Sequence, residues 1–511
     1  MKRRLFLKNL AATTLASRRA PDWMPGTLAS LQAADSAVNG ASGDFFYRPA
    51  DGRVGDVIPF YDGRTIRVFY LHRADHSSPG TSWYQVSTDD FVHFVEHGEM
   101  LPRGTPSDQD LSVATGSVIK REGRYHIFYT GYNSLRKPSK PEQGIMHAVS
   151  EDLLKWQKIP ADTFYAPEAH YERDDWRDPF VFWNDEAREY WMLVAARLKS
   201  GPLRRRGGTA LCASKDLTKW EVREPFWAPG LYFTHECSDL FRMGDWWYLV
   251  FSEFSEGMQT RYRMSRRIAG PWYAPEDDTF DTRALYAAKT CSNGHSRFLL
   301  GWNPIRTAEK DDGKWQWGGN LVAHELVQQP NGALEVQIPK SIDEVFSNKL
   351  PLHMEPVIGK CEIDQDVVTI VAPQSFGAAT IAPMPKRCKI TATVEFTDQT
   401  RACGLMLKLA DDLDSCYYVR LEPVRNRLVF DIWPRPGDVP FMTGMERPVK
   451  LTPGEPVEIK LVVDGTIGEV YIGGRIAMST RMYNLNLGRC GVFVKEGTAH
   501  FRKLGIFSML E

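Results

Sequence analysis

A short strand pattern recurs five times between residues 67 and 302, and this repeat constrains the fold more than any other feature. Each copy is rich in aromatic and β-branched residues, which favour β-strands. The copies are separated by about 50 to 65 residues, when aligned on Phe69, Phe128, Leu193, Val250 and Leu300. Repeats of this length, each with room for several strands, are typical of radial β architectures.

A turn segment follows several of these strands and supports the same interpretation. Two copies, at 152–156 and 216–220, share the pattern Asp-Leu-x-Lys-Trp, and related segments occur at 86–94 and 264–272. Serine and aspartate favour turns, and the aromatic residue opens the next strand. Helical periodicity is poor, whereas 40 Gly and 32 Pro are present. We therefore predict an all-β chain with a five-bladed β-propeller at 42–340; chance similarity within a multi-sheet sandwich is the alternative.

The pattern changes beyond about residue 341. The segments 388–396, 457–463 and 468–472 alternate apolar and polar residues with a period of two. Such alternation indicates antiparallel strands with one face buried, and Asp464-Gly465 and Gly473-Gly474 are typical hairpin turns. The sequence thus predicts a C-terminal antiparallel β-sandwich at 357–511, joined to the propeller by a linker at 339–356.

Three acidic residues occupy nearly equivalent positions in their repeats. Asp56, Asp178 and Glu236 each precede the alignment position of their own repeat by about 14 residues and open an apolar strand. The first strand of each blade lines the central channel, so we expect the three carboxylates to face one another. Clustered like charges raise the pKa of at least one member, as acid–base chemistry on glycosides requires. Turn-capping acids at strand ends are the structural alternative.

These residues carry a resemblance to glycoside hydrolase family 32, the invertase, inulinase and levanase family. Family motifs are matched in order by Thr115-Gly116-Ser117, Arg177-Asp178-Pro179, Glu236-Cys237, Leu285-Tyr286-Ala287-Ala288, Trp317-Gly318-Gly319-Asn320 and Asp464-Gly465 with Glu469-Val470-Tyr471. The resemblance implies a retaining β-fructofuranosidase that acts on sucrose, fructo-oligosaccharides or fructans. It makes Asp56 the nucleophile, Glu236 the general acid/base, Asp178 the transition-state stabiliser and Arg177 a sugar-hydroxyl ligand.

The chain departs from the family pattern around the expected sugar-binding subsite. The nucleophile motif reads Gly55-Asp56-Val57, without the flanking asparagines, and Ala323-His324 replaces the closing Pro-Arg pair. We expect substrate contacts from Arg177 and from a set of further residues, although packing roles are the alternative for several of them. The further candidates are Ser117, Cys237, His72, Trp83 and Trp317.

Three other functions remain open at this stage. A propeller glycosidase that acts on arabinose- or xylose-containing glycans would invert, with its carboxylates farther apart. A fructosyltransferase would pass the same covalent intermediate to a sugar, and a sugar-binding protein would have lost catalysis. We expect a carbohydrate partner, no cofactor and no metal, since the 12 His do not cluster with carboxylates at ligand spacing. The net charge of −1 gives no indication of nucleic-acid binding.

The N-terminal segment indicates export. Lys2-Arg3-Arg4-Leu5-Phe6-Leu7-Lys8 resembles a twin-arginine signal, and residues 1–41 are expected to form a signal peptide and leader. A disordered basic tail on a cytoplasmic protein is the alternative. No apolar run reaches the length of a membrane span, so no membrane partner is expected. The eight cysteines are scattered and predict no disulfide pairing.

Overall fold

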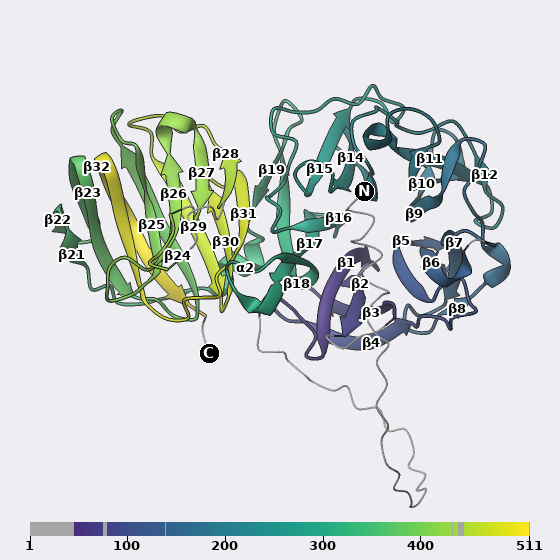
Figure 1. The fold of residues 1–511 in the computed structure, drawn as a ribbon, viewed down its shortest axis with the longest axis horizontal. Helices are drawn as coiled ribbons and strands as arrows, with labels where there is room; N and C mark the ends of the chain where they lie inside the picture. The colour runs from purple at the N-terminus through teal and green to yellow at the C-terminus, as the bar shows by residue number, and fades with distance from the viewer. Residues whose placement is uncertain (1–44, 75–78, 138, 432, 438–443, 510–511) are drawn as a thin grey trace, which may run out of the picture.

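The computed structural model describes residues 45–74, 79–137, 139–431, 433–437 and 444–509. The expected signal peptide and leader at 1–41 lie outside these residues. Strands dominate both domains, and five sets of strands form a ring beside a layered β domain (Figure 1). The helices are short: α2 (Lys340–Val345) and the 3-10 turns Ser134–Arg136, Pro160–Asp162, Leu203–Arg205, Thr307–Glu309 and Pro423–Arg425. Among the described residues, no helix has the length and apolar character needed to cross a membrane.

The ring is a five-bladed β-propeller, which confirms the predicted fold class. Each blade is an antiparallel sheet whose strands follow one another in the chain. Blade one contains β1 (Gly52–Tyr61), β2 (Ile66–Ala74), β3 (Ser82–Thr88) and β4 (Val95–Leu101). Blade two contains β5 (Ser112–Arg121), β6 (Arg124–Tyr132), β7 (Gln143–Ser150) and β8 (Gln157–Lys158). Blade three contains β9 (Tyr171–Asn184), β10 (Glu189–Leu198), β11 (Gly207–Ser214) and β12 (Glu221–Val222).

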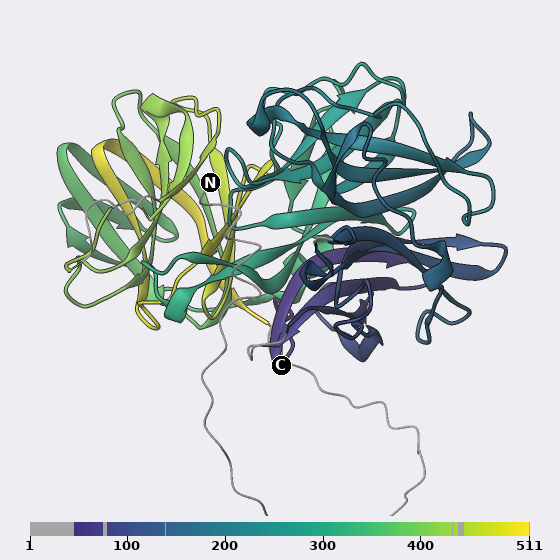
Figure 2. The ribbon, with the colours of Figure 1, turned by 45° about the vertical axis from the view of Figure 1, so that its right-hand side comes forward.

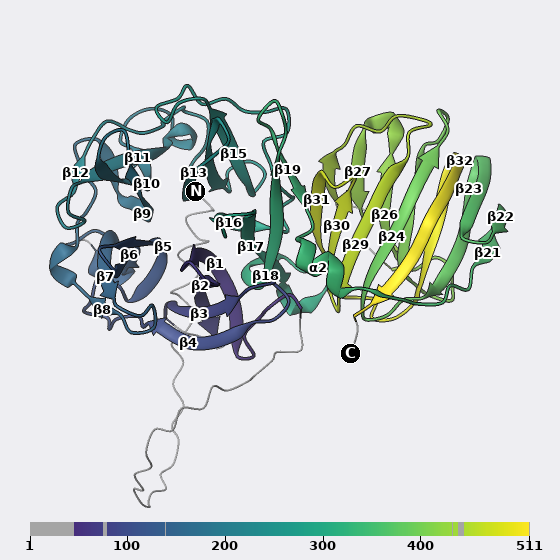
Figure 3. The ribbon, with the colours of Figure 1, turned by 180° about the vertical axis from the view of Figure 1, so that it is seen from behind.

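The last two blades complete the ring, which is seen from behind in Figure 3. Blade four contains β13 (Glu236–Met243), β14 (Trp246–Glu253) and β15 (Gln259–Ser265). Blade five contains β16 (Tyr286–Ser292), β17 (Arg297–Arg306), β18 (Trp315–Gln328) and β19 (Leu334–Gln337). Strand β18 also pairs with β1 at Gly319 and Val54, so the last blade is joined to the first by backbone pairing. This junction closes the propeller.

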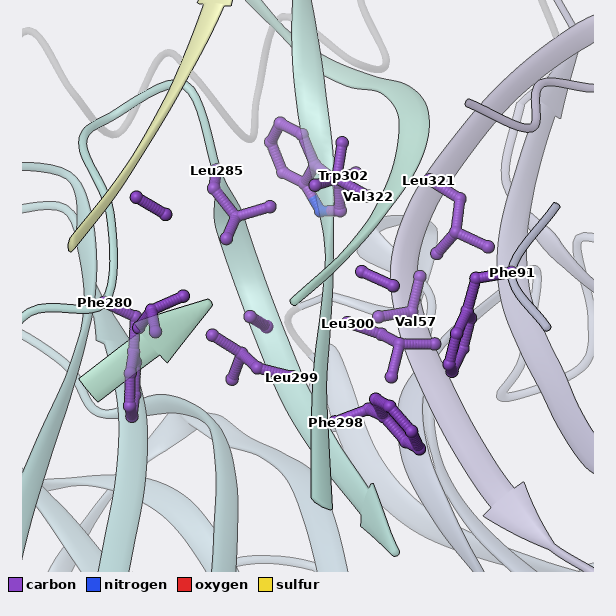
Figure 4. Close-up of a cluster of buried hydrophobic side chains, with 14 of the residues drawn as sticks. Val57, Phe91, Phe280, Leu285, Phe298, Leu299, Leu300, Trp302, Leu321 and Val322 are labelled. Atoms are coloured by element: carbon purple, nitrogen blue, oxygen red, sulfur yellow. The ribbon is translucent and has the colours of Figure 1, made fainter. Parts of the chain in front are cut away.

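A continuous apolar core supports that junction. Val57 of β1 lies beside Leu300 of β17 and Leu321 of β18 in the close-up (Figure 4), and all three are buried. The ring of Phe91, from the turn after β3, packs edge-on against Phe298 with 4.7 Å between ring centroids. Burying such side chains contributes roughly 2 kcal/mol each. The apolar residues of the repeated strands therefore hold the two ends of the propeller together.

The recurring turn has one geometry in blades one, two and three. In blade three, Ser214 Oγ accepts from the backbone of Asp216 and Leu217, and Asp216 Oδ1 accepts from Thr218 and Lys219 at 2.9 Å each. Leu217 is buried at a positive φ of 67°, a conformation that these bonds stabilise. The copies in blades one and two repeat the pattern at Thr88 with Asp90 and at Ser150 with Asp152.

The second domain is a β-sandwich with its own core. Its strands are β20 (Asn348–Lys349), β21 (Glu355–Ile358), β22 (Lys360–Asp364), β23 (Val367–Pro383), β24 (Arg387–Phe396), β25 (Ala402–Leu409), β26 (Tyr417–Glu422), β27 (Arg427–Phe430), β28 (Met445–Pro448), β29 (Val457–Asp464), β30 (Ile467–Ile472), β31 (Ile476–Arg481) and β32 (Arg489–Ser508). Strand β32 pairs with β25 through its first part and with β24 through its second. Strand β20 already pairs with β32, so this sheet begins inside the expected linker.

The two domains share a packed interface, visible where the yellow-green strands lie beside blade five (Figure 2). Apolar residues of β29, β30 and β31 join the same buried cluster as the strands of blade five. Polar contacts add to it: Arg447 reaches across to Asp277 and to the carbonyl of Thr279. The sandwich therefore braces the side of the propeller where the ring closes.

Candidate active site

The inner strands of all five blades carry a pairing irregularity at the same level. In the strand pairs β1–β2, β5–β6, β9–β10, β13–β14 and β16–β17, the register shifts next to Asp56, Thr115, Asp178, Cys237 and Ala287, respectively. Three of these residues, Asp178, Cys237 and Ala287, have positive φ angles between 52° and 57°. β-Bulges of this kind re-aim side chains. The repeated irregularity therefore directs one set of polar groups to the propeller axis.

Asp56 is held by donors from two other blades. Thr115 Oγ1 donates to Oδ2 at 2.5 Å, and the indole Nε1 of Trp302 donates to Oδ1 at 3.0 Å. Burial raises the pKa of Asp56 and the Asp178 carboxylate adds to the rise, whereas both donors and the ammonium of Lys289 oppose it. With both oxygens fixed, the carboxylate is oriented as a nucleophile needs to be.

Glu236 begins β13 and contacts two side chains from neighbouring blades. Arg177 Nη2 donates to Oε1 at 3.1 Å, and Tyr286 OH donates to Oε2 at 2.7 Å. Burial raises the pKa of Glu236 to about 7; Asp178 and Asp56 add to the rise, and Arg177 and Tyr286 counter it. The side chain is 18% exposed, so a bound molecule can reach it. A reachable carboxyl that titrates near neutral pH suits a general acid.

Asp178 is buried between these groups. Its Oδ2 accepts from the backbone N–H of Cys237 at 3.0 Å, and its own N–H donates to Thr130 Oγ1 at 2.8 Å. Arg177 Nε lies 3.9 Å from the same Oδ2. The backbone donor and the neighbouring guanidinium hold this carboxyl group in a fixed position. Asp178 is therefore oriented within the same cluster as Asp56 and Glu236.

Arg177 links the carboxylates of blades three and four. Besides Glu236, it donates to Asp175 Oδ1 at 2.9 Å and to Thr234 Oγ1 at 2.9 Å. These contacts use both terminal nitrogens and fix the plane of the guanidinium. The sequence-predicted residues Asp56, Arg177, Asp178, Glu236 and Cys237 are thus brought together in one site.

Four further residues complete the site, none of which was expected there as a catalytic or substrate-binding residue, although Thr115 and Tyr286 belong to matched motifs. Thr115 and Trp302 bind Asp56, and Tyr286 binds Glu236, as described above. Lys289 is buried on β16 and donates from Nζ to the carbonyl of Gly116 at 2.8 Å. Tyr286 and Lys289 lie on the fifth inner strand, so equivalence among the blades was a signal that pointed to them. Trp302 lies on the neighbouring strand β17, where that signal does not apply.

Two other expected substrate-binding residues, Ser117 and Cys237, are buried on inner strands of the propeller. Ser117 is buried and its Oγ accepts from the backbone of Val181, which links blades two and three. Cys237 is buried, and its Sγ lies 4.0 Å from Asp178 Oδ2. Burial raises the pKa of this thiol, which keeps it neutral among the carboxylates. Cys237 thus contacts the acidic cluster, whereas Ser117 joins two inner strands.

Of the two tryptophans and His72, only Trp317 packs directly beside one of the three acidic residues of the cluster in the contacts that the structure describes. Trp317 is half-buried and packs at Gly55, next to Asp56; a Cβ on Gly55 would lie 2.1 Å from its indole. The indole thus fills the space of the side chain that the nucleophile motif lacks. Trp83 is fully buried and donates to the carbonyl of Ala114. His72 is buried against Tyr84, and its Nε2 lies 3.1 Å from Asp51.

His324, expected beside the sugar subsite, lies instead at the contact between the domains. Its Nε2 is 3.1 Å from Asp281 and 3.9 Å from Glu469 of the sandwich. The sequence indicated no cluster of histidine with carboxylates, because these three residues are far apart along the chain. Tertiary packing brings them together away from the propeller axis.

Comparison with known proteins places both domains. Residues 58–329 match the Glycosyl hydrolases family 32 N-terminal domain, and residues 364–508 match the Glycosyl hydrolases family 32 C terminal domain. A sucrose-6-phosphate hydrolase from Vibrio alginolyticus is 23% identical over 294 residues, covering 50% of this chain and 55% of the relative. A raffinose invertase from Escherichia coli is 26% identical over 289 residues, covering 53% of each. The chain spans about half the length of these curated relatives.

A solved structure extends the likeness of the fold to nearly the whole chain. The exo-inulinase from Aspergillus awamori superimposes with a TM-score of 0.71 at 17% identity. The match covers 93% of this chain and 100% of the inulinase chain. Because the family 32 N-terminal domain alone matches more than half of the sequence, and the C-terminal domain follows in order, the chain belongs to glycosyl hydrolase family 32.

Proposed function

We propose that this protein is a β-fructofuranosidase, a glycoside hydrolase that cleaves fructosidic bonds with retention of configuration. One observation carries the proposal: in one buried cluster, two side-chain donors orient Asp56, and Glu236 is reachable with a pKa raised to about 7. A retaining hydrolase requires one carboxyl group positioned to attack and a second that can give a proton to the leaving oxygen. The matched relatives carry names that refer to sucrose phosphate, raffinose and inulin.

The geometry assigns a role to each group in two steps. Asp56 attacks the anomeric carbon while protonated Glu236 gives its proton to the leaving oxygen, which forms a covalent glycosyl-enzyme. Ionised Glu236 then takes a proton from water, which attacks the same carbon and releases Asp56. Asp178 stabilises the positive charge that develops on the sugar ring, and Arg177 orients Glu236. Half-buried Trp317 offers an apolar face beside Asp56.

The full chain, incubated separately with sucrose, inulin and levan, tests this proposal. NMR of the anomeric carbon of the released fructose during the first turnovers is expected to show the β-anomer ahead of mutarotation. Asp56→Ala is expected to abolish release. Glu236→Gln is expected to lower kcat by about 10²- to 10⁴-fold, because general acid catalysis is lost. Release of the α-anomer first, or full activity of Asp56→Ala, would refute a retaining mechanism with this nucleophile.

We also propose that the chain is exported before it meets its substrate. The twin-arginine-like segment at 2–8 supports this proposal. Fractionation of cells that express the full chain, compared with an Arg3→Lys, Arg4→Lys variant, tests it: export is expected for the wild type and its loss for the variant.

A further inference from the structure

Three potential metal ligands from both domains meet in the interface beside the closed ring. Asp281 lies between β15 and β16, His324 lies on β18, and Glu469 lies on β30. One ligand atom from each lies within 4.8 Å of the other two. Their exposed fractions are 3%, 0% and 1%. No other group of three such side chains with this spacing occurs in the part of the chain that the structure describes.

The charges in this cluster are not neutralised by the described hydrogen bonds. Ser479 Oγ lies 2.7 Å from Asp281 Oδ2 and 2.8 Å from Glu469 Oε2, but one hydroxyl proton serves only one of them. No described residue donates to Glu469 Oε1, although this atom is buried. Burying two carboxyl groups so close together is costly unless a positive charge or a proton offsets them. A bound cation can supply that offset.

The two nearest guanidinium groups already have other partners. Arg447 binds Asp277 and the carbonyls of Thr279 and Ala477. Arg481 binds the carbonyls of Asn303 and Pro304 and the side chain of Asn320. Each guanidinium therefore acts on the carboxylates of Asp281 and Glu469 only through longer-range electrostatic attraction. Neither guanidinium neutralises the carboxylates by a described direct contact.

The spacing of the ligand atoms suits a small tetrahedral ion. His324 Nε2 is 3.1 Å from Asp281 Oδ2 and 3.9 Å from Glu469 Oε2. Nitrogen and oxygen ligands at zinc bond lengths of ~2.0–2.1 Å stand ~3.3–3.4 Å apart in a tetrahedron. The observed separations bracket this value, and Ser479 Oγ lies beside both carboxylates as a third oxygen and a fourth polar atom.

The outer contacts orient the ligands in the way that metal sites require. His324 Nδ1 lies 3.0 Å from Tyr471 OH, which leaves Nε2 for the cluster. Asp281 Oδ1 accepts from the backbone N–H groups of Thr282 and Ser479, and Oδ2, which also accepts from Ser479, lies 3.1 Å from His324 Nε2. Such outer-shell bonds fix the tautomer of a histidine ligand and the position of a carboxylate ligand.

We propose that Asp281, His324 and Glu469 bind one divalent ion of the zinc type, with Ser479 beside it, and that this ion links the propeller to the sandwich. Two carboxylates and a neutral imidazole neutralise its charge. Because its ligands come from both domains, the ion would hold the domains together.

Metal analysis of the full chain, purified without chelators from zinc-supplemented cells, tests the proposal. We expect about one zinc ion per chain by mass spectrometry, and anomalous scattering at the zinc edge at this cluster in crystals. Removal with a strong chelator is expected to lower Tm by several degrees, and added Zn²⁺ to restore it, since a ligand of the folded state stabilises that state. Protein without bound zinc, whose Tm responds to neither treatment, would mean that a proton on Glu469 replaces the ion.

Two variants and a control locate the ion. Glu469→Gln and His324→Gln keep the size of each side chain but remove a ligand atom, so each is expected to lose the zinc and the response of Tm to it. His93→Gln removes an exposed histidine that pairs with Asp90, and it should retain both. Undiminished zinc in both ligand variants would assign the metal to another place. If both variants fail to fold, zinc content and the Tm of wild-type protein decide the question alone.

Discussion

Four neighbours shift the pKa of Glu236, two of them upward and two downward. Asp178 and Asp56 raise the pKa of its carboxyl, Arg177 and Tyr286 lower it, and burial tips the balance to about 7. Because a general acid must be protonated, activity depends on this balance. Replacing one neighbour at a time should therefore move the pH dependence in a direction that follows from its sign.

The basic limb of the profile of kcat/KM against pH is expected near pH 7 in the wild type. Tyr286→Phe removes a donor to Oε2, which should raise the pKa of Glu236 and move this limb to higher pH. Asp178→Asn removes a negative charge, which should lower that pKa and move the limb to lower pH. Steady-state rates measured from pH 4 to 9 check both shifts. Identical basic limbs in the two variants would contradict the assignment of Glu236 as the acid.

Lys289 is expected to act on the other carboxylate. Its ammonium lowers the pKa of Asp56, which must be ionised to attack. Lys289→Met should therefore raise this pKa and move the acidic limb of kcat/KM to higher pH. Lys289→Gln keeps a donor for the carbonyl of Gly116 without the charge, so an equal shift in both variants would identify charge as the cause. An acidic limb that stays in place would leave Lys289 a structural role only.

Single residues show how far the sequence could predict the site. Asp56, Asp178 and Glu236 were predictable because equivalent positions on inner strands converge at the axis. Trp302 was not, since its indole reaches Asp56 from a second strand across 246 residues of chain. The surroundings of His72 and Trp83 could not be predicted either. They depend on which face of each strand packs against a neighbouring blade, and the local sequence does not show that.

At the scale of elements, the repeated turn gives the blades a common connection. Ser and Asp side chains satisfy four backbone N–H groups and hold one buried leucine in a left-handed conformation. The Asp-Leu-x-Lys-Trp pattern predicted these turns, since local hydrogen bonds depend on nearby residues alone. The bulges of the inner strands were not predictable, because pairing across strands creates them.

Asp216→Ala is expected to destabilise the propeller by about 1 kcal/mol, since two backbone donors lose their acceptor at an exposed turn. Asp216→Asn keeps an acceptor oxygen and should lose less. Backbone hydrogen bonds lower the pKa of Asp216. The difference in unfolding free energy between the wild type and the alanine variant should therefore be largest above pH ~4 and shrink as the pH falls further. Thermal unfolding at pH 7 and pH 3 checks this. Equal losses for Ala and Asn at pH 7 would contradict it.

For the whole molecule, the interface makes the two domains one mechanical unit. Arg447 is buried there and reaches from the sandwich to Asp277 and Thr279 of the propeller. The domain order was predictable from the change of pattern near residue 341. The interface was not, because it joins segments such as β18 and β30 whose contact depends on how two finished domains pack.

Arg447→Met should weaken the coupling between the domains. The change leaves the partly exposed Asp277 without its guanidinium partner, a loss that is expected to cost about 1–3 kcal/mol. Calorimetry of the wild type is expected to show one transition, and the variant an earlier or divided one. Arg475→Met, on the same domain but exposed, serves as control. An unchanged unfolding profile in Arg447→Met would mean that apolar packing alone couples the domains.

The pairing of β1 with β18 also sets the order in which the protein can mature. A ribosome completes Val54 long before its partner Gly319, and Asp56 long before Trp302. Contacts of such sequence separation form late, since a long loop must close first. A nascent chain that holds the first four blades therefore contains all three acidic residues but has no finished catalytic centre. Enzymatic activity, followed during refolding, would report the moment at which the ring closes.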